Sequence, residues 1–146
     1  ELDPANKWAY INLGYCYQQI GDYENAIEDY KKTIELDPAY IPPLSNMAWL
    51  LATCPIKEYR NGKKAQEYIR RATELITAEE PYQMLYDMYN SMAAVYAETG
   101  KFVEAIATQK KAIELLDEAE DRKKQDELNE YKDRLTFYQV HKPWRC

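Results

Sequence analysis

Apolar side chains recur every three or four residues along the chain, which is the spacing of one face of an α-helix. Gly21 separates the first two series, because glycine commonly ends a helix. The two series comprise Leu13, Tyr17 and Ile20, then Ala26, Ile27, Tyr30 and Ile34. The same period continues toward the C-terminus and predicts an all-α protein. The predicted helices span residues 6–20, 23–36, 40–53, 62–76, 80–99, 102–117 and 120–139.

The chain also repeats itself at a fixed interval. The tetrapeptide ELDP at residues 1–4 returns at residues 35–38, thirty-four residues later. A period of this length predicts stacked structural units. Six positions of the first unit, Leu13, Gly14, Tyr17, Gly21, Tyr23 and Ala26, correspond to Met92, Ala93, Tyr96, Gly100, Phe102 and Ala105. A diverged unit lies between them, in which the interval from Met47 to Ala65 is five residues longer than that from Leu13 to Ala26.

This pattern resembles the tetratricopeptide repeat (TPR) family, whose helix-turn-helix unit has thirty-four residues. The resemblance implies a right-handed α-solenoid of three units and a C-terminal capping helix. We expect one domain over residues 1–146. Its predicted parts are the end of a preceding repeat at 1–4, repeats at 7–40, 41–77 and 80–117, an inserted loop at 54–61, a capping helix at 120–139 and a tail at 140–146.

Two segments indicate where in an array the chain lies. The stretch NMAWLLATCP and the tail YQVHKPWRC resemble the last repeats of a group of bacterial TPR proteins. Residues 1–4 resemble the last turn of a helix that starts earlier. We therefore expect the C-terminal part of a longer TPR protein.

Composition and charge exclude several classes of function. The net charge is −6, and residues 1–40 contribute most of it, with eight acidic against three basic residues. The chain has no concentrated basic stripe, so nucleic acid is not an expected partner. A single histidine argues against a metal site, and no cofactor is predicted. No apolar run approaches the twenty residues of a membrane span.

The three cysteines, Cys16, Cys54 and Cys146, have no CxxC spacing and cannot all pair with one another. This usage slightly favours the cytoplasm, while the compartment stays open because the sequence shows no natural start. Cys54 has no histidine or acidic residue near it in sequence, so we interpret it as a structural thiol. His141 and the charged runs of residues 117–134 are predicted to be solvated.

The resemblance implies a concave groove lined by the first helix of each unit, which in the family binds peptides. Carried over by position, the groove residues are Trp8, Ile11, Asn12, Tyr15, Gln19, Ser45, Asn46, Trp49, Asp87, Asn90, Ser91, Ala94 and Glu98. Rigid aromatic rings and side-chain amides suit peptide recognition. An alternative for Trp8 and Trp49 is that they pack between repeats.

One TPR subclass binds the C-terminal carboxylate of chaperone tails through lysine, asparagine and arginine residues. Ile11 and Tyr15 stand where that subclass has lysine and asparagine, and Asp87 and Ser91 stand where it has basic residues. Asn46 alone matches. An acidic chaperone tail is therefore not the expected partner. Because the predicted groove contains Asp87 and Glu98, we expect a neutral or basic partner segment.

Small residues predict where helices approach closely. Gly14 lies inside the first helix, and Ala26, Ala65 and Ala105 lie at equivalent positions of the second helices. Ala94 is predicted to face the groove, so a glutamate there is expected to be tolerated, whereas a glutamate at Ala105 is expected to unfold the third unit.

The predicted function is a non-catalytic protein–protein interaction module. Two alternatives stay open. The chain could be a regulatory or docking segment of a larger enzyme or assembly factor, because TPR arrays are often attached to such domains. It could also associate with a second copy of itself, forming a homo-oligomer.

Overall fold

A computed structural model describes residues 6–77, 79–118 and 125–145. In this part of the chain every regular element is helical, as predicted. The elements are α1 (Lys7–Gln19), α2 (Tyr23–Leu36), α3 (Ile41–Thr53), the short 3-10 helix η1 (Lys57–Tyr59), α4 (Gly62–Leu75), α5 (Tyr82–Glu98), α6 (Phe102–Glu118) and α7 (Gln125–Gln139). The predicted segment 1–4 and the first residues of the predicted capping helix lie outside the described residues.

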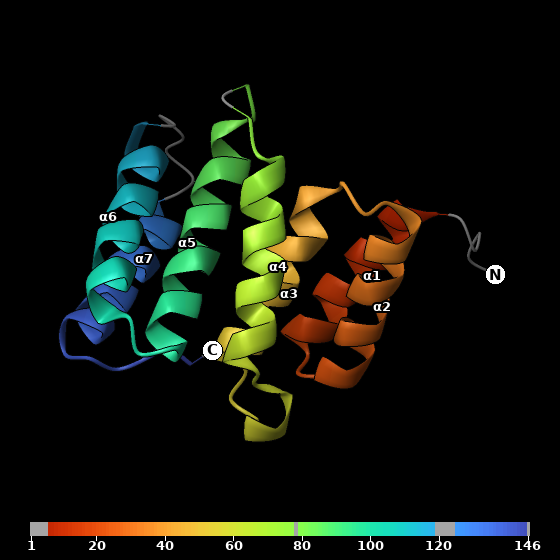
Figure 1. Cartoon of the computed structure of the whole chain (residues 1–146), viewed down its shortest axis with the longest axis horizontal. Coiled ribbons are helices and arrows are strands. Elements are labelled where there is room, and N and C mark those ends of the chain that lie inside the picture. Colours follow the sequence, from red (N-terminus) through yellow and green to blue (C-terminus); the bar gives the residue numbers. More distant parts are fainter. Residues whose placement is uncertain (1–5, 78, 119–124, 146) are drawn as a thin grey trace.

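The helices pack side by side as a solenoid (Figure 1). α1 packs on α2, α3 on α4 and α5 on α6, while α3 also contacts α2 and α5 and so joins neighbouring pairs. The predicted all-α solenoid is therefore confirmed. The predicted long loop after α3 contains η1 and projects beyond the N-terminal end of α4 (Figure 1).

Polar caps and glycines set the ends of the helices. The side chains of Asn6, Asp22 and Asn61 each accept a hydrogen bond from a backbone N–H three residues later, which satisfies a free donor at the helix start. Gly21 and Gly100 have φ angles of 81° and 78°, a left-handed conformation that glycine adopts without strain. These two glycines therefore make the tight turns from α1 to α2 and from α5 to α6.

The predicted close approach at Gly14 is confirmed. A Cβ atom at this position would lie 2.8 Å from the ring of Tyr30, a fully buried residue that packs on α1. In the other two pairs, alanine replaces Gly14, and Ile69 or Gln109 replaces Tyr30. A larger partner on the second helix is thus accompanied by a smaller residue on the first.

α7 was predicted to be a capping helix whose outer face is solvated, and it differs from this prediction. Leu128 and Tyr131 of α7 pack with α6 residues, as a cap requires. Arg134, however, is 8% exposed, which corrects the prediction that the charged residues of 117–134 are all solvated. Exposed His141 follows α7 with a φ of 56° and stacks on Phe102. The tail then returns to α3, where Arg145 donates a hydrogen bond to the carbonyl of Ala52.

Candidate functional site

A cavity of about 520 Å³ lies between α1, α3, α5 and α7, and we call it the inner groove. It is lined by Tyr15, Gln18, Gln19, Asn46, Trp49, Gln83, Asp87, Asn90, Ser91, Glu127, Glu130, Tyr131 and Arg134. A second cavity of about 380 Å³ shares Asn46, Gln83 and Asp87 with it and adds Ser45. We treat the two cavities as one continuous groove.

Eight predicted site residues are brought together in this groove. They are Tyr15, Gln19, Ser45, Asn46, Trp49, Asp87, Asn90 and Ser91, from the first helix of each pair. Trp8 and Asn12 are exposed but line neither cavity, and Trp8 packs edge-on against Tyr40 with ring centroids 5.1 Å apart.

Three predicted residues do not face the groove. Ile11 is 8% exposed and Ala94 is 2% exposed, and both belong to the main hydrophobic core. The prediction that Ala94 faces the groove is therefore wrong, because it lies on the buried stripe of α5 beside Val95. Glu98 is occupied by ion pairs with Arg60 and Arg145.

Arg134 is the main residue that sequence reasoning missed. Its guanidinium carbon lies 4.8 Å from the ring centroid of Trp49, 5.1 Å from Tyr131 and 5.6 Å from Trp144. Cation–π contacts of this kind stabilise a buried charge. The sequence spacing could have indicated this burial. Arg134 follows Tyr131 by three residues and precedes Tyr138 by four, which places it on the apolar face of α7.

A buried polar network fixes the groove wall formed by α5 and α7. The amide of Gln109, fully buried on α6, donates hydrogen bonds to Asn90 at 3.2 Å and to the backbone carbonyl of Tyr131 at 3.1 Å. Arg134 also donates to Asn90, at 3.1 Å. The hydroxyl of Tyr131 donates to Asp87 at 3.1 Å. Burial raises the pKa of Tyr131, so its hydroxyl keeps the proton that it donates.

The inner groove contains polar atoms without hydrogen-bond partners among the described residues, and its lining carries an excess of negative charge. The hydroxyl of Ser45 and the Nε of Arg134 are buried and make no hydrogen bond to the described residues. Asp87, Glu127 and Glu130 line the groove against the single base Arg134, which pairs with Glu130 at 2.9 Å. The groove therefore presents hydrogen-bonding groups, aromatic rings and a net negative charge.

Comparison with known protein families identifies the repeats. Residues 8–40 and residues 86–115 each match a tetratricopeptide repeat model. The chain is a tetratricopeptide repeat protein. No curated protein matches it as a relative. TPR repeats are generally protein–protein interaction modules and typically non-catalytic scaffolds. None of the described helices has the length and apolar character needed to cross a membrane.

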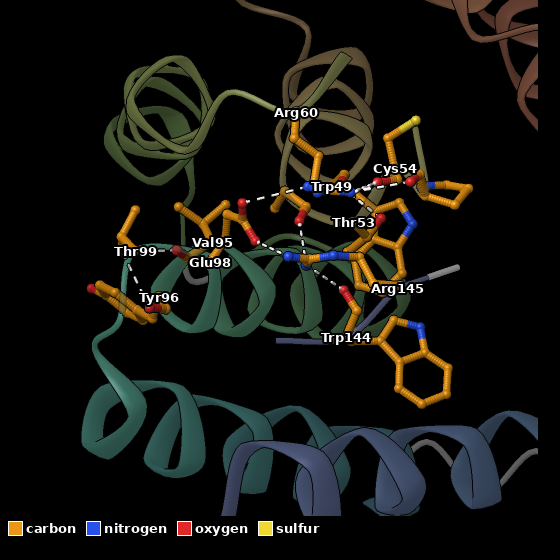
Figure 2. Close-up of polar contacts among 12 residues, drawn as sticks. Trp49, Thr53, Cys54, Arg60, Val95, Tyr96, Glu98, Thr99, Trp144 and Arg145 are labelled. Atoms are coloured by element: carbon orange, nitrogen blue, oxygen red, sulfur yellow. Dashed lines mark hydrogen bonds and ion pairs between the residues drawn. The ribbon is translucent and has the colours of Figure 1, made fainter. Parts of the chain in front are cut away.

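A charged cluster joins the inserted loop and the tail of this TPR protein to α5 (Figure 2). Glu98 Oε1 lies 3.7 Å from Nε of Arg60 in the loop, and Glu98 Oε2 lies 2.7 Å from Nη2 of Arg145 in the tail. Arg60 also donates to the carbonyl of Cys54, which is fully buried at the end of α3. The burial of Cys54 fits a structural role.

We expect Glu98→Gln to lower the free energy of unfolding by about 2 kcal/mol, because the Glu98 side chain is 17% exposed and holds two arginines. Urea unfolding followed by circular dichroism measures this change. Glu74→Gln is the matched control, since the Arg70–Glu74 pair is largely exposed and should contribute less than about 1 kcal/mol. Equal losses in the two variants would show that the cluster does not secure the loop and tail.

Proposed function

We propose that the inner groove binds an extended segment of a partner protein whose residues are neutral or basic. The observation that carries the proposal is the convergence of eight predicted site residues, from three helices, on one continuous groove. Three pairs of these residues occupy equivalent positions of the units, namely Tyr15 and Trp49, Ser45 and Asn90, and Asn46 and Ser91.

The side chains of the groove suit an extended backbone. The ring of Tyr15 is 55% exposed and offers contact area at low cost in conformational entropy. The amides of Gln19, Asn46 and Gln83 line the groove and carry both donors and acceptors. The buried hydroxyl of Ser45 gains a partner if a bound segment supplies one.

The charges of the groove support the preference for a neutral or basic segment. Asp87, Glu127 and Glu130 outnumber Arg134, and Arg134 is already enclosed by rings and paired with Glu130. An acidic segment would meet like charge along α5 and α7, which disfavours association.

The proposal is tested by selecting peptides from a display library on the wild-type protein and measuring their affinities by fluorescence anisotropy. We expect the selected peptides to be richer in lysine and arginine than in aspartate and glutamate. Tyr15→Ala/Gln83→Ala should weaken their binding roughly tenfold or more, because it removes an aromatic contact and an amide of the groove.

Tyr82→Ala/Gln139→Ala is the matched control, since Tyr82 is 53% exposed, Gln139 is exposed and neither lines the groove. The control should bind like the wild type. If both double variants bind the peptides equally well, or if the selected peptides are predominantly acidic, the proposal is wrong.

A further inference from the structure

A second groove lies on the opposite face of the solenoid from the inner groove, and the inserted loop forms one of its walls. This outer groove is a cavity of about 340 Å³ between α2, α4 and the loop. Ile27, Met47 and Leu51 are its apolar residues. Tyr59 and Tyr68 add two half-buried aromatic rings.

The loop that forms one wall is held in place before any partner binds. The N–H of Asn61 donates to the carbonyl of Leu51 at 2.9 Å, and Arg60 donates to the carbonyl of Cys54 at 2.7 Å. The ring of Tyr59 lies against Tyr23 of α2, with ring centroids 6.1 Å apart. Such a pre-formed wall reduces the entropy lost on binding.

The outer groove carries the opposite charge from the inner groove. Four bases, Lys31, Arg60, Lys64 and Arg71, line it against two acids, Glu58 and Glu67. Among the described residues, Lys31, Lys64 and Arg71 have no acidic partner within 4.0 Å, whereas Arg60 is paired with Glu98. This positive surface stands out on a chain with a net charge of −6.

The first turn of α4 also carries positive charge beside the outer groove. It contains Lys63 and Lys64 and no acidic residue, whereas the first turns of the second helices of the other two pairs, α2 and α6, contain Glu24 and Glu104. Bases at a helix N-terminus are disfavoured by the helix dipole. Residues that do not favour helix stability are expected where a surface serves a function such as binding.

We propose that the outer groove binds a short acidic segment of a partner protein, with an apolar side chain on Ile27 and Leu51. Lys64 and Arg71 of α4 and Lys31 of α2 form the basic part. Along α2 the surface continues into a cavity where Glu24, Glu28 and Glu35 outnumber Lys31 and Lys32. The segment is therefore short and lies along α4. This site is separate from the inner groove and prefers the opposite charge.

The test uses a short, end-blocked, fluorescein-labelled peptide of glutamate, serine and leucine, and a second peptide in which lysine replaces every glutamate. We expect the acidic peptide to bind the wild-type protein and the basic peptide not to bind this surface. Lys31→Gln/Lys64→Gln/Arg71→Gln should weaken the binding of the acidic peptide roughly tenfold, and added salt should weaken its binding to the wild type.

The matched control is Lys110→Gln/Lys132→Gln/Lys142→Gln, which removes the same charge from exposed lysines elsewhere. It should retain the wild-type affinity for the acidic peptide. The tyrosine and glutamine variant of the inner groove should retain it too, which separates this test from that of the proposed function. Undetectable binding of the acidic peptide, or equal loss of its binding in the outer-groove variant and in this control, would overturn the proposal.

Two further outcomes would also overturn it. Tighter binding of a single-stranded oligonucleotide than of the acidic peptide, lost in the outer-groove variant, would assign the surface to nucleic acid. A wild-type dimer in size-exclusion chromatography that the outer-groove variant abolishes would make a second copy of this chain the occupant.

Discussion

Ala105→Glu should unfold the α5–α6 pair. Ala105 is fully buried beside Ala93, Ala97 and Tyr138, so a glutamate there has no room and no route to water. An uncompensated buried charge costs about 3–5 kcal/mol, which is a large share of the total stability of a protein of this size. Urea unfolding followed by circular dichroism should show a loss of this order.

Ala107→Glu is the matched control, because Ala107 lies on the exposed face of the same helix. It should change the free energy of unfolding by less than about 0.5 kcal/mol. Ala94→Glu should destabilise the protein strongly, like Ala105→Glu, since Ala94 is 2% exposed. A tolerated glutamate at Ala94 would contradict the packing of α5, and one at Ala105 would contradict the packing of α6 on α5.

Alkaline pH should destabilise the protein through three buried tyrosines. Burial raises the pKa of Tyr30, Tyr131 and Tyr138 above the ordinary value of 10.0. The folded state keeps these protons while the unfolded chain releases them. The stability is therefore fully present below pH 10 and is lost as the pH rises above it.

Each of the three tyrosines should lower the free energy of unfolding by about 1 kcal/mol between pH 10 and pH 11. Urea unfolding at both pH values measures the loss, and tyrosinate absorbance should rise as the protein unfolds. Tyr138→Phe should remove about 1 kcal/mol of the loss. It should not weaken the protein at pH 7, because the Tyr138 hydroxyl makes no hydrogen bond to the described residues.

Tyr82→Phe serves as the control because Tyr82 is 53% exposed, whereas Tyr138 is fully buried. It should leave the loss between pH 10 and pH 11 unchanged. A loss that Tyr82→Phe and Tyr138→Phe reduce equally would show that burial is not its cause.

Much of the fold follows from local features of the sequence. The apolar period and the glycines predict the helices, and the ends of α2 agree with the predicted residues 23–36. Small residues predict the tight pairs, as the distance from Gly14 to the Tyr30 ring shows. These features were predictable because each depends on residues within one helix pair.

The parts that sequence reasoning missed depend on contacts between distant segments. Arg134 contacts Trp49, and Arg145 contacts Glu98 and Ala52. Two charges that look solvated in sequence are therefore buried, at Arg134, or half-buried, at Arg145. Ala94 was misplaced for a related reason. The repeat offset predicts which helix carries a residue. Whether a residue at the border between groove and core is exposed depends on which neighbouring helix packs against it.

The most direct test of the inner groove is the response of side-chain amide resonances in a two-dimensional ¹H–¹⁵N NMR titration with a peptide selected on the wild-type protein. The groove contains Gln19, Asn46 and Gln83, while Asn25 and Gln139 lie elsewhere on the surface. We predict that the amide signals of the three groove residues shift on binding and that those of Asn25 and Gln139 do not. Shifts at Asn25 or Gln139 with an unchanged groove would contradict the assignment of this surface as the binding site.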